Sequence, residues 1–206
     1  MTPTWDILIC SIPHRTLLLI DLLTELERQH QPGVGILVCR DNVEMPYGDK
    51  CQKLLEASDA DYVSFLDDDD WIVGDFVHVI REALREEPDY VGFKVKYTED
   101  GVPQMPVIHS LEHNGWHNTP DALYRDIVHF NPIRRDLALQ ARWSGGGGAD
   151  RDWADHLRKL NIVNTQVFID REIHHYRHEG WTFSVPERLA DPPPAPDGFT
   201  KVTWVA

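Results

Sequence analysis

Short apolar runs alternate with amphipathic segments along the first 100 residues, and this alternation constrains the fold more than any other feature of the sequence. Strands are predicted at residues 5–10, 34–39, 62–66 and 89–97, and helices are predicted at residues 16–28, 48–57 and 73–86, where apolar residues recur at helical spacing. Alternating strands and helices form a largely parallel, doubly wound sheet. We therefore predict an α/β fold.

The second half of the sequence is less regular. Residues 101–118 contain proline, glycine and three histidines, which indicates a loop or a hairpin. The later elements are predicted as a short strand and helix within 130–141, a helix at 149–160, and strands at 162–169 and 172–176. Residues 191–198 are rich in proline and predict an extended tail, because proline lacks the backbone donor that regular structure needs.

Composition and charge narrow the class of protein. The net charge of −14 argues against a protein whose main task is to bind nucleic acid, because affinity for a phosphate backbone comes from lysine and arginine. The three cysteines have no CxxC spacing and predict reduced thiols. No leader peptide is recognised, and no apolar stretch approaches the roughly 18 residues that cross a bilayer. The expected location is the cytoplasm.

Four consecutive aspartates, Asp67 to Asp70, follow the predicted strand at 62–66 and precede the apolar residues 71–73. Two carboxylates about 4 Å apart repel by roughly 4 kcal/mol at an effective dielectric constant near 20. One interpretation is a solvated loop, in which water and salt offset the repulsion. The other is a bound divalent cation, because apolar neighbours hold the run at the edge of the core. Carboxylate oxygens suit Mg²⁺ or Mn²⁺, which can also bind a diphosphate.

Four segments of the sequence carry a resemblance to a known family: SIPHR at 11–15, GDK at 48–50, FLDDDDW at 65–71 and GADRDW at 148–153. In this order and spacing they resemble the GT-A glycosyltransferases, in particular the family 2 enzymes, whose signature is a strand that ends in an Asp-x-Asp motif. The resemblance covers about residues 5–185. It implies one GT-A, Rossmann-like domain at 1–188, with a mostly parallel mixed central sheet flanked by helices.

The resemblance divides this domain by function. Residues 1–100 would bind the nucleotide sugar, residues 101–188 would hold the acceptor and the catalytic base, and residues 189–206 would be a proline-rich C-terminal tail. Within the first half, Asp41 would accept a hydrogen bond from uracil and Lys50 would reach the diphosphate. The first turn would face the base and the diphosphate through Ser11, Ile12, Pro13 and Arg15. Arg15, Asp41 and the acidic run would all lie at the carboxyl ends of the strands, where doubly wound sheets bind ligands.

Within the acidic run, the resemblance implies that Asp67 or Asp68 lies near the ribose and that Asp69 is the principal ligand of Mn²⁺ or Mg²⁺. The additional aspartates leave this register open by one residue. The segment HHYRH at 174–178 is similar to a Tyr-Arg-His segment near the end of many family 2 domains. It implies that His178 or His175 is a further contact to the metal or the phosphate, although a histidine is more often a surface or packed residue.

Family 2 enzymes usually carry a Glu-Asp pair near the start of a later helix, where the carboxylate acts as general base towards the acceptor hydroxyl. The matching pair here is Ala149-Asp150, so the glutamate is absent. Asp150 is the expected base, and Asp152 is the second choice. The alternative is that Asp150 only stabilises the first turn of its helix, as acidic residues at helix starts often do.

The resemblance places the acceptor site within residues 101–145. Four aromatic side chains are candidates for stacking on a sugar, although tryptophan is more often a core residue. They are Trp116, His117, Trp143 and Trp181.

The resulting hypothesis is a metal-dependent glycosyltransferase. It would move a hexose or N-acetylhexosamine from a uridine-diphosphate sugar to an acceptor hydroxyl, with inversion at the anomeric carbon. The acceptor stays open among protein, glycan, lipid and modified nucleic acid. One alternative is a nucleotidyltransferase with a similar metal and nucleotide site, which would release pyrophosphate. The other is a sugar-binding protein that keeps the sheet but is catalytically inactive.

Overall fold

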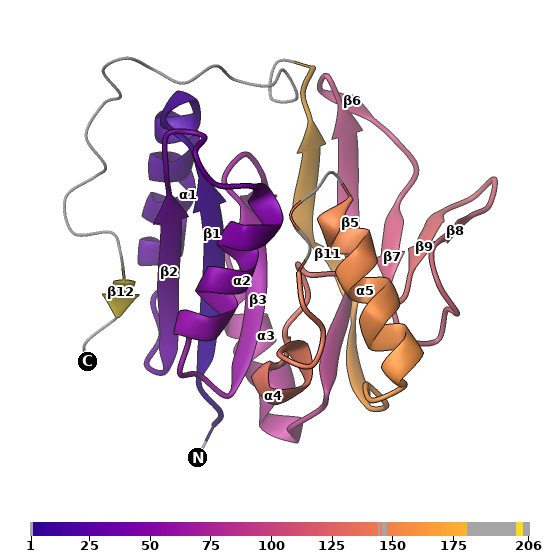
Figure 1. Cartoon of the computed structure of the whole chain (residues 1–206). Coiled ribbons are helices and arrows are strands. Elements are labelled where there is room, and N and C mark those ends of the chain that lie inside the picture. The colour runs from indigo at the N-terminus through magenta and orange to yellow at the C-terminus, as the bar shows by residue number, and fades with distance from the viewer. Residues whose placement is uncertain (1, 144, 146–147, 181–200, 204–206) are drawn as a thin grey trace.

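The computed structural model of the protein describes residues 2–143, 145, 148–180 and 201–203. Its first half alternates strands and helices as predicted (Figure 1). The elements of this half are β1 (Trp5–Ser11), η1 (Pro13–Arg15), α1 (Thr16–Arg28), β2 (Val34–Arg40), α2 (Tyr47–Ala57), β3 (Tyr62–Asp67), β4 (Trp71–Ile72), α3 (Phe76–Ala83), η2 (Leu84–Glu86) and β5 (Tyr90–Glu99).

The helix predicted at 73–86 is shorter than expected. Residues 71–72 form β4, which pairs with β11, and the amide of Val73 donates to the carbonyl of Ile173 at 3.1 Å. Because these long-range hydrogen bonds hold the chain extended, α3 begins only at Phe76 and gives way to η2 at Leu84.

The second half contains more strands than the sequence predicts. Its elements are β6 (Val102–Pro103), β7 (Val107–His109), β8 (His117–Asn118), β9 (Leu123–Arg125), β10 (Ile133–Arg134), α4 (Arg135–Ala138), α5 (Ala149–Leu160), β11 (Gln166–His178) and β12 (Lys201–Thr203). The segment 101–118 thus contributes strands to the sheet and is not only a loop. The two strands predicted at 162–169 and 172–176 are one strand, because a shift of register between Ile169 and Glu172 lets β11 continue along β5.

Part of the predicted C-terminal tail belongs to the sheet. Residues 201–203 form β12, which pairs antiparallel with β2. The proline-rich residues 191–198 lie outside the described residues. No helix in the described ranges is both long and apolar enough to cross a bilayer.

The strands form a mixed sheet in the order β12-β2-β1-β3-β10-β5-β7-β9-β8. Strands β2, β1 and β3 are parallel, and β11 runs parallel to β5. The strands β10 and β7 are antiparallel to β5. Because β5 from the first half pairs with β7, β10 and β11 from the second, the sheet joins both halves of the chain. The predicted α/β fold with a mixed central sheet is confirmed.

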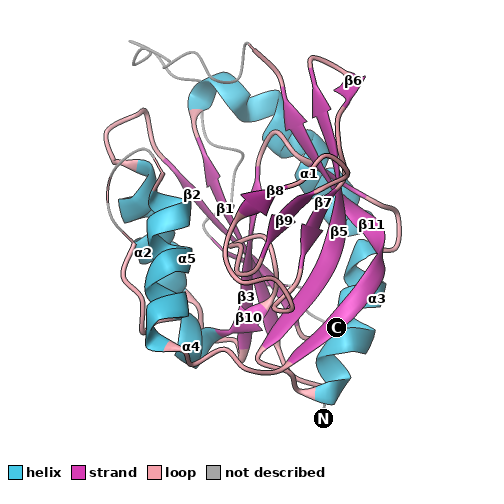
Figure 2. Cartoon of the chain, turned by 90° about the vertical axis from the view of Figure 1, so that its right-hand side faces the viewer, coloured by secondary structure: helices cyan, strands magenta, loops and turns pink. Residues whose placement is uncertain are grey.

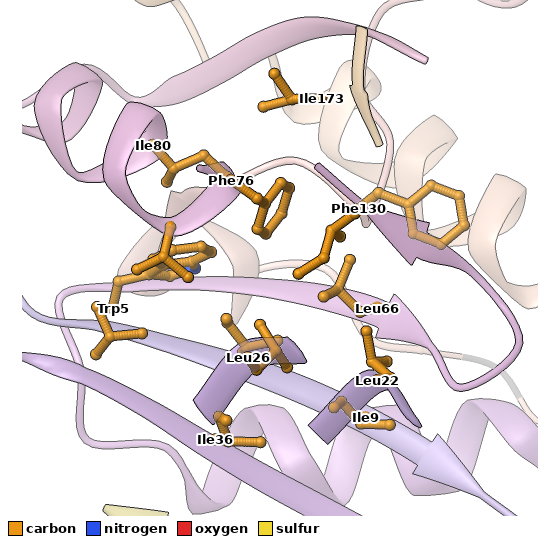
Figure 3. Packing of buried hydrophobic residues seen from close by; sticks show 14 of the residues in the cluster. Trp5, Ile9, Leu22, Leu26, Ile36, Leu66, Phe76, Ile80, Phe130 and Ile173 are labelled. Carbon is orange, nitrogen blue, oxygen red and sulfur yellow. The ribbon is translucent and has the colours of Figure 1, made fainter. Parts of the chain in front are cut away.

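Helices cover both faces of this sheet (Figure 2). Along β1, Trp5, Ile7 and Ile9 point into a core under α1 and α3, and Leu8 and Cys10 point into a second core under α2 and α5. This division follows from the alternation of side chains along a strand. Figure 3 shows the packing of the first core, with labelled side chains that include Leu22, Leu26, Phe76 and Ile80.

The parallel strands end at one edge of the sheet. In their register Cys10 pairs with Asp67 and Ser11 pairs with Arg40. The first turn, Asp41 and the acidic run therefore leave the sheet side by side, as the sequence predicts.

The two faces of α1 differ sharply in burial, which gives a test of the fold. Leu22 is 1% exposed in the first core, whereas Leu17 is 77% exposed. We expect Leu22→Ala to lower the free energy of unfolding by about 2–5 kcal/mol, because it leaves a cavity in a packed core. Leu17→Ala should change it by less than about 0.5 kcal/mol. Urea denaturation measures both, and equal effects of the two variants would contradict this placement of α1.

Candidate functional site

The acidic run forms a tight turn between β3 and β4. The amide of Asp70 donates to the carbonyl of Asp67 at 3.2 Å. The side chains of Asp68, Asp69 and Asp70 are buried, and that of Asp67 is half-buried. The interpretation of the run as a solvated loop is therefore wrong. Burial of so much like charge requires partners for the carboxylates.

Arg15 is the first of these partners. The η1 turn, in which the Arg15 amide donates to the carbonyl of Ile12 at 3.0 Å and Pro13 is buried, directs the guanidinium towards the acidic run. Its Nη1 lies 3.1 Å from Asp68 Oδ1 and 3.2 Å from Asp69 Oδ1. Burial raises the pKa of Asp68 to about 6, although Arg15 works against the rise. The cation thus offsets part of the cost of burying two carboxylates.

Lys50 and Asp41 form a second ion pair at the same edge of the sheet. Lys50 reaches from α2 to the carboxylate of Asp41, and its Nζ donates to the carbonyl of Ser11 at 3.3 Å. The second oxygen of Asp41 accepts the amide of Met45 at 2.5 Å. Burial raises the pKa of Asp41, but the contacts with Lys50 and Met45 outweigh it and leave the pKa below its usual range. The structure thus brings these donor-site candidates together, and their binding roles stay predictions.

Asp70 fixes the acidic run to β11. Its Oδ2 lies 2.8 Å from Nε2 of His174, and its Oδ1 accepts the amide of Arg177 at 3.0 Å. The Nε of Arg177 also donates to the carbonyl of Asp69 at 2.8 Å. Burial lowers the pKa of His174 to about 3 and raises the pKa of Asp70 well above its usual range, so the two groups share one hydrogen bond inside the protein. Sequence analysis missed the His174–Asp70 pair, although both residues lie in segments that it identified.

The other two histidines of 174–178 make different contacts. Nδ1 of His178 lies 3.8 Å from Oε1 of Glu99, and Nε2 of His175 lies 3.0 Å from the hydroxyl of Thr98. Neither contact is with the acidic run, and a metal-binding role for His178 stays a prediction.

A cavity of about 340 Å³ opens beside the acidic run. Asp67 from β3 and Asp150 from α5 both line it, together with Tyr47, whose hydroxyl donates to Asp67 Oδ1 at 3.3 Å. Burial and the neighbouring carboxylates raise the pKa of Asp67 well above its usual range. The remaining lining residues are Val95, Tyr97, Val107, His109, Trp116, Leu123, Arg125, Val128, His129, Phe130 and Tyr176. The cavity thus unites the acidic run with the predicted catalytic base inside a largely aromatic wall.

Helix α5 presents the two candidate bases differently. Asp150 is half-buried and lines the cavity, whereas Asp152 is exposed. Both lie in the first turn of α5, after Gly148, whose φ of 82° places the N-cap in the left-handed region. Of the two, the geometry favours Asp150 as a group that can reach a molecule in the cavity. The catalytic role itself stays a prediction.

The aromatic candidates for sugar stacking lie in different environments. Trp116 lines the cavity, whereas Trp143 is buried and stacks on Trp153 with 5.1 Å between ring centroids. Trp143 is therefore a core residue. His117 is exposed and stacks on Tyr124. Trp181 lies outside the described residues.

The residues of the acidic run fit a divalent cation. Oδ2 of Asp68 is buried without a hydrogen-bond partner in the part of the chain that the structure describes. In that part, no group of three or more His, Cys, Asp or Glu side chains converges to hold a metal by itself. The unpartnered oxygen of Asp68 suits Mg²⁺ or Mn²⁺, which proteins bind through one or two carboxylates while phosphate oxygens and water complete the shell.

Comparison with known proteins places the fold. No family model and no curated protein matches the sequence. The fold nevertheless matches that of solved structures, and it is a GT-A fold. The crystal structure of S. aureus TarS 1–349 matches with a TM-score of 0.65 and 16% identity, over 84% of this chain and 60% of that chain.

Two ligand complexes of the same TarS fragment also match. The complex with UDP-GlcNAc has a TM-score of 0.65 and 14% identity, over 84% of this chain and 58% of that chain. The complex with UDP has a TM-score of 0.62 and 15% identity, over 84% of this chain and 60% of that chain. The chain therefore spans about three fifths of the TarS fragment.

The contact between Asp70 and β11 gives a test of the site. We expect His174→Ala to lower the free energy of unfolding by about 1–3 kcal/mol, because it leaves Oδ2 of the buried Asp70 without its hydrogen-bond partner. His156→Ala on α5 is the matched control, since His156 is exposed, and should change stability by less than about 0.5 kcal/mol. Chemical denaturation measures both variants. A His174→Ala protein as stable as the control would show that the pair does not stabilise the fold.

Proposed function

We propose that the protein is a glycosyltransferase that moves a sugar from a uridine-diphosphate sugar to an acceptor hydroxyl. One observation carries the proposal: Asp67 of the acidic run and Asp150 of α5 line the same cavity. A donor phosphate site and a carboxylate base must face each other across a reacting sugar, and the shared cavity supports such an arrangement.

The donor side is supported by the edge of the sheet and by the comparisons. Arg15 and Lys50 supply positive charge at the carboxyl ends of β1 and β2, where a diphosphate would bind. TarS, a family 2 glycosyltransferase, has the same fold and is solved with UDP-GlcNAc and with UDP. We infer that Asp41 contacts the uracil and that Asp67 or Asp68 lies near the ribose.

The metal requirement rests on the burial of the carboxylates. Asp69 would be the principal ligand of Mn²⁺ or Mg²⁺, and Asp68 has an oxygen free for a second bond in the described part of the site. The ion would act as a Lewis acid that stabilises the charge of the departing diphosphate.

The reaction that we propose is a direct displacement. The oxygen of the acceptor hydroxyl forms a bond to the anomeric carbon while the bond between that carbon and the diphosphate oxygen breaks. Asp150 takes the hydroxyl proton, and the bonding electrons leave with uridine diphosphate. Since attack and departure occur on opposite sides of the anomeric carbon, the configuration would invert.

The donor proposal is tested by calorimetry on the full chain. We expect UDP-N-acetylglucosamine or UDP-glucose to bind with a measurable heat in the presence of Mn²⁺ and at least about tenfold more weakly without it. Asp69→Asn should remove this metal dependence, because the amide has no charge to hold the ion. Asp59→Asn is the control, since Asp59 is exposed on the loop before β3.

Three outcomes would count against the proposed function. No binding of any uridine-diphosphate sugar would contradict the donor proposal. Release of pyrophosphate from a nucleotide substrate, and not of uridine diphosphate, would instead identify a nucleotidyltransferase. Binding without turnover on any acceptor would favour the inactive sugar-binding protein.

The catalytic base is tested by paired variants on one helix. We expect Asp150→Asn to slow release of uridine diphosphate from the sugar nucleotide by about 10²–10⁴-fold in the presence of an acceptor panel, because a general base is lost. Asp152→Asn should keep most of the rate, and both variants should bind UDP as the native protein does. Slowing by Asp152→Asn and not by Asp150→Asn would move the base to Asp152.

A further inference from the structure

Trp116 at the cavity wall is the centre of a small cationic cluster. The guanidinium carbon of Arg125 lies 5.2 Å from the centroid of the Trp116 ring, and that of Arg151 lies 6.0 Å from it. The indole Nε1 donates to the carbonyl of Ile127 at 3.1 Å, which fixes the ring. We call Arg125, Trp116 and Arg151 the arginine–tryptophan cluster.

The charges of the two arginines of the cluster act on each other. Burial and the nearby charge of Arg151 lower the pKa of Arg125. Neither arginine has an ion pair among the described residues: Asp126 and Asp155 both pair with Arg158, and Asp150 and Asp152, the chain neighbours of Arg151, form no ion pair with either arginine of the cluster.

The chain carries 34 acidic and 20 basic residues, so the lack of an ion pair at these two arginines does not reflect a shortage of carboxylates. Nη1 of Arg125 donates to the carbonyls of His117 and Tyr124 and to Oδ1 of Asn118, which are neutral acceptors and leave its charge unbalanced. Two arginines without an ion pair in the described residues, beside a cavity, favour an anion from outside the chain.

The arginine–tryptophan cluster lies beside Asp150, the proposed catalytic base. Trp116, Arg125 and Asp150 line the same cavity, and Arg151 follows Asp150 on α5. Arg15 and Lys50, by contrast, already have carboxylate partners and lie at the strand edge. The anion at the cluster is therefore separate from the donor diphosphate and lies on the side of the base.

We infer that the acceptor carries an anionic group, a phosphate or a carboxylate, that binds the arginine–tryptophan cluster while its reacting hydroxyl lies beside Asp150. This inference rests on the proposed function. The Trp116 ring would stack on the sugar or polyol part of the acceptor, and the guanidinium groups would donate to the anion. The cluster also overcomes the repulsion that a net charge of −14 exerts on an anionic acceptor.

The test uses three small probes of one shape: glucose 6-phosphate, glucuronate and glucose. Each is titrated into the full chain with and without UDP, and the indole N–H signal of Trp116 is followed by ¹H–¹⁵N NMR. We expect at least one anionic probe to bind about tenfold more tightly than glucose, the effect of one charge-assisted hydrogen bond. The preferred probe tells phosphate from carboxylate.

Variants locate the anion. Arg151→Gln should weaken the preferred anionic probe about tenfold towards the affinity of glucose and leave glucose unchanged, and Arg151→Lys should keep most of the affinity. Arg151 is exposed, so the change does not disturb the core. Arg85→Gln is the control with the same change of charge, since Arg85 pairs with Glu82 beside α3, on the other face of the sheet.

The outcomes separate this inference from the proposed function. Equal affinity of the three probes, no binding of any, or equal weakening by Arg85→Gln would overturn it. If UDP binds the native protein and Arg151→Gln alike while the probes do not discriminate, the donor proposal stands and only the anionic acceptor fails. If UDP does not bind at all, the proposed function fails, whatever the probes show.

Discussion

The structure depends on the burial of negative charge where β3 ends. Three successive carboxylates, Asp68 to Asp70, lie inside the protein, and an isolated buried charge costs several kcal/mol. Arg15 comes from the turn after β1, and His174 and Arg177 come from β11. These partners are far apart in sequence, so the acidic turn is stable only when three elements assemble around it. The site and the fold therefore form together.

The sheet carries this assembly across both halves of the chain. Strand β5 pairs with β11 on one side and with β10 and β7 on the other, which sets the second half against the first. As a result, Asp67 and Asp150 meet at one cavity. Two candidate groups that line one cavity suit chemistry that needs a fixed distance between leaving group and base.

Charge is distributed unevenly over this molecule. The chain is strongly acidic, yet cations gather at two places: Arg15 and Lys50 at the strand edge, and the arginine–tryptophan cluster at the cavity wall. At the first place carboxylates form ion pairs with the cations, whereas at the second neither Arg125 nor Arg151 has an ion pair among the described residues. The two places thus favour ligands of different charge, and we assign the first to the donor and the second to the acceptor.

The sequence by itself determined the alternation of strands and helices, the bounds of α1 and α5, and the edge at which Ser11, Asp41 and Asp67 emerge. Those features follow from local periodicity and from the parallel topology that it implies. Only the tertiary structure decided that Asp70 is hydrogen-bonded to His174, that Trp143 is a core residue, and that Arg125 and Arg151 both contact the Trp116 ring. Contacts between distant segments leave no periodic pattern in the chain, so they become visible only when the sheet has brought those segments together.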